Sequence, residues 1–324
     1  MKKIAVIIPV SESEDPQVVL HSAKKITSLD YQNLTAKIVY VIDVTIEKDE
    51  RITLLKKEGI EVFSRQRRGK RGGAINDALL YLTDFKPDYV ALFDVDSRPE
   101  RNFVTECLTA LENDTRAYIA SSRRYISNPV NFVSRTIQAE YYVLNFLLKK
   151  SAFKQFNGLI GVLRADLLYK HKLNEGAIAE DADYATRMHY KGYAAILVTT
   201  TTLYEQSPVR WRDLLSQRKR WYYGGLQLWR YWDDVKRSNN KKFILSWVMA
   251  LAMSYYIIIF LPLVIFSPFI ILFYSKKASP RLSPSVSAGL VLYILALQYA
   301  AITAIFNFVR GRSVEWESMK RVVD

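Results

Sequence analysis

Acidic residues close two of the apolar runs in the first hundred residues. Asp43 ends the run 36–43, and Asp94 and Asp96 end the run 88–96, DYVALFDVD. Carboxylates two positions apart at a strand end point to one side, so both can approach one divalent cation directly or through water. The alternative to a metal site is that these acids are ordinary surface charges or caps. Three acids behind two buried-looking runs favour a metal site, with Asp94 and Asp96 as its ligands.

A basic segment rich in glycine, RQRRGKRGGAINDALLYL, occupies residues 65–82, between these acids. Its glycines let the backbone approach a ligand closely, its cations can pair with phosphate, and a helix starting near Ala74 would offer its N-terminus to an anion. A solvated basic loop followed by a helix is the alternative. No Gly-Lys-Ser/Thr follows a four-residue gap, so this is not a Walker A loop. A nucleotide site of another type is consistent with the pattern.

Three more acids lie in four residues of the segment GAIAEDADYATRMHYKGYAAILVTT, residues 176–200. Glu180 and Asp181 stand where a helix ending near Gly192 would begin, and acids there complement the helix dipole, which could explain Asp183 entirely. Capping explains less well why three acids cluster in a chain with a net charge of +14. A carboxylate that takes a proton from an alcohol needs such a fixed position.

The elements that carry these residues alternate between strand and helix. Short apolar runs cover 3–10, 36–43, 61–65 and 88–96, and helical patterns cover 16–29, 47–58 and 73–82. Such alternation predicts an α/β fold with a mostly parallel sheet and helices on both faces. In such sheets ligands gather at the carboxyl ends of the strands, where Asp43 and Asp94 lie.

The C-terminal third is apolar. Residues 243–274 and 286–309 form two uncharged segments, each longer than the roughly 20 residues that cross a bilayer. The first would measure about 48 Å as one helix, so we expect a tilted span or a break at Pro262 or Pro268. Cations before the first segment and after the second favour two spans with both ends cytosolic, although cations in the connecting loop weaken this topology. We therefore divide the chain into a catalytic region, 1–235, and a membrane region, 236–324.

Composition limits the partners. The excess of cations, 46 Lys and Arg against 32 Asp and Glu, points to phosphate, nucleic acid or an acidic membrane face. A single cysteine, Cys107, excludes an internal disulfide, and acids and a proline come too early for a signal peptide. We expect a cytosolic catalytic region. Residues 126–156 mix apolar, aromatic and cationic side chains, as either an interfacial helix or a core-packed one would.

The order of these motifs resembles the family 2 inverting glycosyltransferases. The matching features are Asp43, the glycine and lysine loop, the DxD of residues 94–96, FNG at 156–158, Glu180-Asp181 and QRKRW at 217–221. The resemblance covers roughly residues 4–230 and is nearest to the membrane-attached branch of cellulose, chitin and hyaluronan synthases and ceramide glucosyltransferase. It implies a Rossmann-like GT-A fold that binds a nucleotide sugar.

The resemblance also implies roles for single residues. Asp181 would be the general base, with Glu180 beside it as the alternative, and Asp94 and Asp96 would hold the donor diphosphate through Mg²⁺ or Mn²⁺. Trp221 and Gly158 would line the acceptor side, whereas Arg218 and Lys219 would only flank a membrane. The donor-binding residues would be Asp43, Lys70, Gly73, Asn76, Asp94, Gln217 and Arg220.

Two departures from the family pattern affect specificity. The usual TED reads AED, with Ala179, and the segment after Asp43 lacks a frequent second Asp or Ser. We expect a UDP-sugar rather than a GDP-sugar. Because only two spans are expected, we favour a lipid or lipid-linked acceptor at the plasma membrane in a multi-pass protein. A processive polysaccharide synthase is the alternative; a nucleic acid partner is not expected, and a homo-oligomer is left open.

Overall fold

The computed structural model describes residues 1–44, 49–66, 70–253, 255 and 284–314. Its strands are β1 (Lys2–Val10), β2 (Leu34–Asp43), β3 (Glu61–Arg65), β4 (Tyr89–Leu92), β5 (Arg98–Pro99), β6 (Ala117–Ile126), β7 (Gly161–Arg164) and β8 (Ala194–Glu205). The helices of the first two hundred residues are α1 (Pro16–Thr27), α2 (Glu50–Lys57), α3 (Arg71–Tyr81), α4 (Phe103–Asn113), α5 (Phe132–Lys150), η1 (Asn157–Leu159), α6 (Ala165–His171) and α7 (Glu180–Tyr190). The later helices are α8 (Trp211–Leu228), η2 (Trp229–Tyr231), α9 (Trp232–Lys236), α10 (Lys241–Met253) and α13 (Pro284–Val309).

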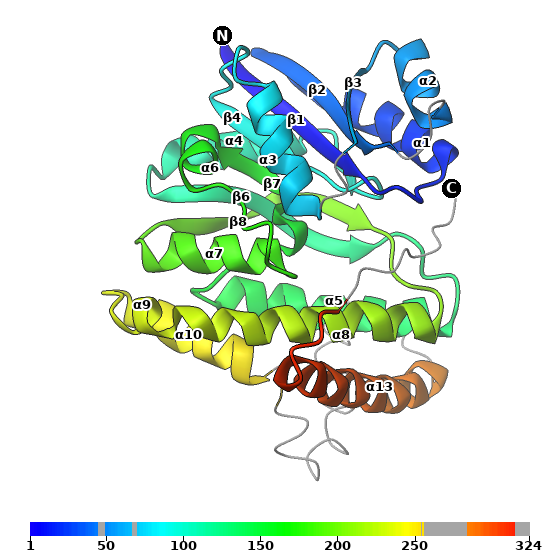
Figure 1. Ribbon diagram of the computed structural model, residues 1–324, viewed down its shortest axis with the longest axis vertical. Coiled ribbons are helices and arrows are strands. Elements are labelled where there is room, and N and C mark those ends of the chain that lie inside the picture. The colour runs from blue at the N-terminus through cyan, green and yellow to red at the C-terminus, as the bar shows by residue number, and fades with distance from the viewer. Residues whose placement is uncertain (45–48, 67–69, 254, 256–283, 315–324) are drawn as a thin grey trace. The chain divides into compact units, whose positions relative to one another are not determined.

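The strands form one sheet in the order β3-β2-β1-β4-β7-β6-β8-β5 (Figure 1). β1 pairs in parallel with β2 and β4, and β2 pairs in parallel with β3. β7 runs antiparallel to β4 and β6, and β5 runs antiparallel to β8. The α/β class is confirmed, but the sheet is mixed rather than mostly parallel, because β7 is inserted antiparallel to both of its neighbours and β5 is antiparallel to β8.

The burial of β1 explains why apolar and polar residues do not alternate in its sequence. Ile4, Val6 and Ile8 are fully buried in a core cluster that includes Val19 and Ile26 of α1. The residues between them, on the opposite face of the strand, are also fully buried, and α3 packs against β1 and β2 on the sheet. A strand covered on both faces reads as a continuous apolar run.

The fourth predicted strand is shorter than its sequence pattern suggested. β4 ends at Leu92, and Asp94 begins a turn in which its main-chain oxygen accepts from the Ser97 amide at 2.9 Å and its own amide donates to Ser97 Oγ at 3.0 Å. Asp and Ser favour such turns because their side chains bond nearby main chain. The argument that strand alternation aligns Asp94 and Asp96 is therefore wrong: a turn presents them.

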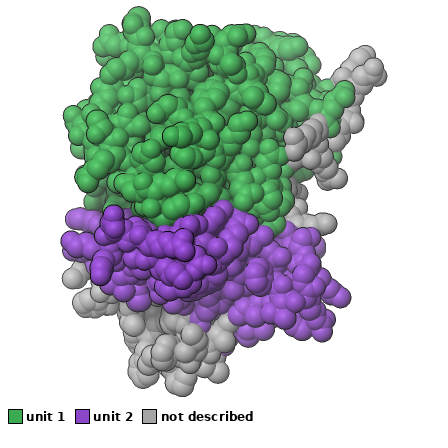
Figure 2. All heavy atoms as spheres, turned by 60° about the vertical axis from the view of Figure 1, so that its left-hand side comes forward, with its two compact units in different colours: residues 1–123, 154–204, 321–324 green, residues 124–153, 205–320 purple. Residues whose placement is uncertain are grey.

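The chain divides into two compact units, coloured separately in Figure 2. One contains residues 1–123 and 154–204, and the other contains 124–153 and 205–320. The division into a catalytic region, 1–235, and a membrane region, 236–324, stays a prediction, and α5 and α8 fall in the same unit as α13. Their shared apolar core comprises Ile126, Val133, Ile137, Tyr141, Leu214 and Tyr293.

α13 is the helix, among the described residues, that is long and apolar enough to cross a bilayer by length and composition. The qualifying stretch is Leu292–Val309, with a mean hydropathy of 1.8. It coincides with the second predicted segment, 286–309. The first, 243–274, begins within α10, and its residues 254 and 256–274 lie outside the described part of the chain. The two-span topology stays a prediction.

Candidate active site

Arg71, the first residue of α3, joins acidic residues from two distant segments. Its Nε donates to Asp94 Oδ1 at 2.8 Å and its Nη1 donates to Glu180 Oε1 at 3.2 Å. Burial lowers the pKa of Arg71, but the charges of Asp94 and Glu180 outweigh burial and raise that pKa, so the guanidinium stays charged. Its Nη2 is buried without a hydrogen-bond partner in the described residues. One cation thus brings the DxD turn and the start of α7 together.

Gly158 lies between Asp181 and Asp94. Its amide donates to Asp181 Oδ2 at 2.6 Å, and the Ala182 amide donates to Asp181 Oδ1 at 2.8 Å. Gly158 has a φ of 64°, and a Cβ there would lie 3.1 Å from Asp94 Oδ2 and 3.4 Å from Arg71 Nη2. Gly158 therefore packs closely against a carboxylate oxygen and a guanidinium nitrogen, and any side chain at this position would crowd them.

The pairing of β4 with β7 explains why these segments meet. Leu92, the last residue of β4, pairs with Gly161, the first residue of β7. Because the strands are antiparallel, the residues just before Gly161 lie beside those just after Leu92. The FNG turn is thereby placed next to Asp94, although the two are more than sixty residues apart in sequence.

Asp43 belongs to a neighbouring ionic cluster at the ends of β2 and β3. Asp43 is paired with Arg65 in the parallel register, and Arg65 Nε donates to Asp43 Oδ1 at 2.5 Å. Arg65 Nη1 also donates to Asp77 Oδ2 at 2.7 Å. A Cβ on Gly73 would lie 3.8 Å from Arg65 Nη1, so the first turn of α3 borders both clusters.

Asn76 and Lys70 contact the loop before α7. Asn76 is 7% exposed, donates to the Leu173 oxygen at 3.0 Å and accepts from the Leu173 amide at 3.0 Å. This reciprocal pair braces the loop and leaves little of the Asn76 amide for a ligand. Lys70 Nζ donates to the Gly176 oxygen at 3.3 Å. Donor contacts by Lys70, Gly73 and Asn76 stay predictions.

The donor atoms around Asp94 are suited to a hard divalent cation. Asp94 Oδ1 accepts from Arg71, whereas Oδ2 lies against Gly158, and Asp96 follows in the same turn. Within the described ranges no group of three or more His, Cys, Asp or Glu is arranged to hold a metal. Mg²⁺ and Mn²⁺ accept a few carboxylates completed by water and substrate phosphate oxygens. The residues therefore fit a cation that arrives with a phosphorylated ligand.

Gln217, Arg220 and Trp221 share α8, in the second unit, at the spacing that places them on neighbouring turns. Arg218 corrects a sequence expectation. It is 4% exposed, and its Nη2 donates to Glu140 Oε2 of α5 at 2.5 Å. A buried, paired arginine is not a flanking membrane charge; it contacts Glu140 of α5 and the ring of Tyr293 of α13.

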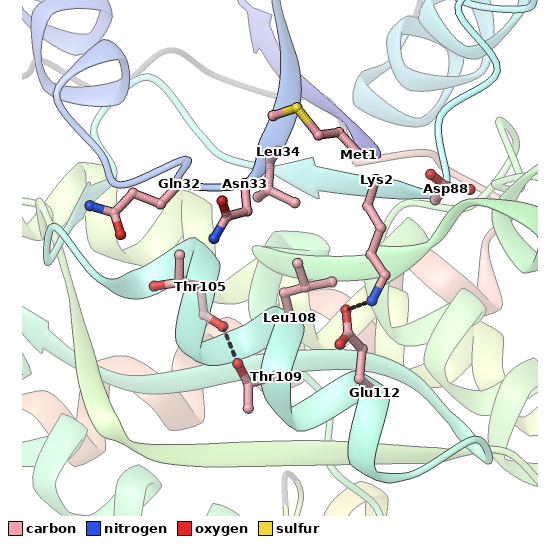
Figure 3. A pocket seen from close by; sticks show the side chains of 10 residues that line it. All are labelled: Met1, Lys2, Gln32, Asn33, Leu34, Asp88, Thr105, Leu108, Thr109 and Glu112. Carbon is pink, nitrogen blue, oxygen red and sulfur yellow. Dashed lines mark hydrogen bonds and ion pairs between the residues drawn. The ribbon is translucent and has the colours of Figure 1, made fainter.

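A cavity of about 700 Å³ lies elsewhere, at the amino ends of the strands (Figure 3). Met1 lines it from just before β1, Lys2 and Leu34 line it from β1 and β2, and α4 contributes further residues, including Glu112, which pairs with Lys2. None of the predicted site residues lines this cavity. The cluster around Arg71, by contrast, follows the carboxyl ends of the strands, where α/β sheets bind ligands.

Comparison with known proteins identifies the family. A profile described as Glycosyl transferase family group 2 matches residues 89–306, and one described as Glycosyl transferase family 2 matches residues 6–171. Each covers more than half of the chain. The chain belongs to glycosyl transferase family 2. The resemblance based on motif order is confirmed at this level, and the branch of cellulose, chitin and hyaluronan synthases stays a prediction.

The curated relatives of this family 2 chain include plant enzymes. It is 25% identical over 204 residues to glucomannan 4-beta-mannosyltransferase 7 of Arabidopsis thaliana, a match that covers 60% of this chain and 37% of that enzyme. A probable glucomannan 4-beta-mannosyltransferase 14 of the same plant is 24% identical over 247 residues, covering 70% of this chain and 45% of its own length. The chain thus spans less than half of these relatives.

Solved structures share the fold. A mannosyltransferase from Pyrobaculum calidifontis, in complex with GDP-Man and Mn²⁺, superposes with a TM-score of 0.61 at 17% identity, covering 96% of this chain and 88% of that one. S. aureus TarS 1–349 superposes with a TM-score of 0.53 at 12% identity, covering 98% and 94%. The mixed α/β fold of this family 2 chain is therefore GT-A-like.

Sequence reasoning assigned a role to Lys70 and none to its neighbour Arg71. Arg71 is one of five cations between residues 65 and 71, so nothing in its composition singles it out. One signal was present: a cation in the first turn of a helix opposes the helix dipole. Such a cation needs an anionic partner, and Arg71 has two.

Substitution of Gly158 by alanine should lower activity strongly. The added Cβ would crowd Asp94 Oδ2 at 3.1 Å, and a φ of 64° costs an alanine about 1–2 kcal/mol. We expect kcat/KM for sugar transfer to fall by about 10²-fold, because a small displacement of a reacting group has that effect. Steady-state transfer assays measure it.

Gly59→Ala is the matched control. Gly59 has a φ of 71°, and a Cβ there would meet nothing within 4 Å. Gly59→Ala introduces the backbone strain without the crowding, so its stability loss should not exceed that of Gly158→Ala, and its activity should stay near that of the wild type. Equal activity losses in both variants would mean that strain, rather than crowding at Asp94, explains the effect.

Protonation of Glu180 should cause the fall in kcat/KM on the acidic side of the pH profile. Burial, followed by the charge of Asp181, raises the pKa of Glu180, and Arg71 only partly offsets this. As pH falls through that raised pKa, Glu180 is neutralised and Arg71 loses one of its two anionic partners. We expect kcat/KM to begin falling at a higher pH than an ordinary glutamate would produce. Glu180→Gln should shift this fall to lower pH, and an identical fall in both proteins would contradict this.

The raised pKa of Glu180 also makes the free energy of unfolding depend on pH. The folded chain binds the Glu180 proton more tightly than the unfolded chain, because its folded pKa is the higher one. Between the ordinary glutamate pKa and the raised pKa, the free energy of unfolding therefore decreases as pH rises. Denaturant titrations of the wild type and Glu180→Gln should diverge in that window.

Proposed function

We propose that this chain transfers a hexose from a nucleoside-diphosphate sugar to an acceptor hydroxyl, with inversion at the anomeric carbon. The observation that carries the proposal is the buried Nη2 of Arg71, which has no hydrogen-bond partner in the described residues and lies beside Gly158, with Asp94 on one side and the segment of Asp181 on the other. A charged guanidinium fork next to carboxylates fits a diphosphate accompanied by a cation.

Asp181 acts as the general base in this proposal. The Asp181 carboxylate takes the proton of the acceptor hydroxyl, the acceptor oxygen forms a bond to the anomeric carbon, and the bond from that carbon to the diphosphate oxygen breaks. The nucleoside diphosphate leaves with the bonding electrons. The two main-chain amides of Gly158 and Ala182 fix the orientation of the carboxylate. A single displacement of this kind inverts the configuration.

The remaining residues orient the donor. Arg71 supplies positive charge to the diphosphate, and a divalent cation held by Asp94 and Asp96 would offset further charge on the leaving group. Asp43 accepts from Arg65 and is assigned to the nucleoside. On α8, Arg220 is assigned to the pyrophosphate, Gln217 to the donor and Trp221 to a sugar face, since an indole offers a flat apolar surface.

The names of the relatives, and the donor bound to one of them, guide the choice of the transferred sugar. The plant relatives are named as mannosyltransferases, and the Pyrobaculum calidifontis structure contains GDP-Man. The sequence favours UDP only through its resemblance to synthases that use it. We therefore place mannose first among the transferred sugars and GDP-mannose beside UDP-sugars as the donor.

An apolar surface on α13 supports a membrane-associated acceptor. Its exposed large side chains recur every three or four residues: Leu292, Leu295, Tyr299, Ile302, Phe306 and Val309. The opposite side of the helix is buried, including Ala300 and Ala304. A stripe of this kind on one helix face suits the acyl region of a bilayer. We assign the chain to the plasma membrane, with the catalytic region cytosolic and a lipid or lipid-linked acceptor.

The test is a product assay. Detergent-solubilised full chain is incubated with Mn²⁺ or Mg²⁺, a panel of GDP- and UDP-sugars, and membrane lipid extract, and products are identified by mass. We expect one hexose added to a lipid, with the metal required. Label found solely as free sugar would refute the transfer to lipid, and turnover without a divalent cation would refute the metal assignment.

A processive polysaccharide synthase is the second candidate, because the plant relatives are named for glucomannan, a polymer. It uses the same donor chemistry and differs in the acceptor, which would be the growing chain. Product length separates the two: a ladder of long products favours the synthase, and a single added hexose favours the lipid acceptor.

A further inference from the structure

A buried cation on α8 contacts the aromatic residue of the QRKRW motif. The guanidinium carbon of Arg218 lies 4.1 Å from the ring centroid of Trp221, one turn further along the helix. It also lies 5.9 Å from the ring of Tyr293 on α13. Trp221 itself is only half-buried, so part of its ring is accessible. Arg218 therefore contacts a ring that keeps part of its surface accessible to a ligand.

Glu140 anchors this guanidinium from a second helix. Arg218 Nη2 donates to Glu140 Oε2 at 2.5 Å, and the exposed fractions of the two side chains are 5% and 17%. The pair lies beside an apolar core that includes Leu214, one turn before Arg218 on α8, and Ile137 and Tyr141 of α5. The guanidinium of Arg218 thereby links α8 to both α5 and α13.

Stability alone is a poor explanation for this pair. Replacing a buried ion pair by apolar side chains of similar volume is often neutral or stabilising, because desolvating two charges is costly. Arg218 Nε also lacks a hydrogen-bond partner within the part of the chain that the structure describes. An arginine placed only for its ion pair would use that nitrogen. The guanidinium carbon of Arg218 instead lies over two aromatic rings, those of Trp221 and Tyr293, which attract a cation.

We propose that the Glu140–Arg218 pair is a positioning device that fixes the orientation of the Trp221 ring for the acceptor. The proposal rests on the proposed function in assigning Trp221 to the acceptor side. Arg218 itself acts through Trp221 and touches neither donor nor acceptor. Without it, the indole should rotate among several orientations and offer the acceptor no fixed surface.

The test separates positioning from folding by removing both charges together. In Arg218→Met/Glu140→Met no buried charge is left unpaired, so the thermal midpoint should stay close to that of the wild type. The full chain is labelled with 5-fluorotryptophan, and Trp221→Phe assigns the Trp221 resonance in the ¹⁹F spectrum. We expect this resonance to shift and broaden in the double variant. Lys219→Met, which removes the adjacent cation of the same motif, is the matched control and should leave it unchanged.

Kinetics give the second readout. We expect the double variant to lose about tenfold or more in kcat/KM for the acceptor, while the dissociation constant for the nucleoside diphosphate with Mn²⁺ stays within about twofold. Arg218→Lys keeps the charge but not the planar guanidinium, and should recover part of the loss. A double variant with wild-type stability, an unchanged Trp221 resonance and full transfer would overturn the proposal. If the wild type transfers no sugar, the proposed function fails, and the ¹⁹F spectrum still decides whether Arg218 positions the ring.

Discussion

Asp181→Asn is expected to reduce sugar transfer by about 10²–10⁴-fold, the range that a general base contributes. The carboxylate accepts two main-chain hydrogen bonds, from Gly158 and Ala182, and an asparagine oxygen can replace only one acceptor while its amide cannot take up the acceptor proton. The loss should appear in kcat, and the affinity for the nucleoside diphosphate should change little. Transfer rates at saturating donor, together with calorimetric titration of the nucleotide, measure both quantities.

Asp166→Asn is a suitable control for that variant. Asp166 is an exposed acid in the first turn of α6, within the same compact unit. Its substitution removes the same charge from a comparable helix position. Its transfer rate should stay within about twofold of the wild type. Retention of transfer in Asp181→Asn would move the base assignment to Glu180 and leave the rest of the site intact.

Arg71→Met is expected to lower kcat/KM by about 10²–10³-fold, the effect of removing one group that stabilises charge in a transition state. It should also destabilise the fold, because Asp94 and Glu180 would lose their shared cation; removing one partner of a buried pair costs about 3–5 kcal/mol. The side chain of Arg71 is 20% exposed, so we expect the lower part of that range. Unlike Asp181→Asn, this variant should bind the nucleoside diphosphate more weakly.

Arg116→Met controls for the loss of one cation from a strongly basic chain. Arg116 is 79% exposed at its side chain, and its partner Asp114 lies 3.5 Å away, so solvent screens the pair. Activity and nucleotide affinity should be unchanged. Arg71→Lys retains charge without the fork that reaches two carboxylates, and should fall between the wild type and Arg71→Met. Wild-type nucleotide affinity in Arg71→Met would refute its assignment to the diphosphate.

Local patterns in the sequence were sufficient for the elements and the order of the motifs. β-branched runs predict β1, β2 and β3, and 3.6-residue periodicity predicts α1 and α2, because these signals depend on residues a few positions apart. The acids Asp43, Asp94 and Asp181 were found because strand ends and helix starts are visible locally. Their order along the chain led to glycosyl transferase family 2, which the comparison with known families confirmed.

The partners of each charge depended on contacts between segments far apart in the chain. Arg71 meets Glu180 across 109 residues, and Arg218 meets Glu140 across 78. Within a basic run every arginine looks alike, so the sequence could not distinguish Arg71 from Lys70 or the buried Arg218 from a flanking charge. Gly158 likewise matters because antiparallel pairing of β4 with β7 places it beside Asp94. Burial and charge pairing are properties of three-dimensional neighbours, and one-dimensional spacing does not record them.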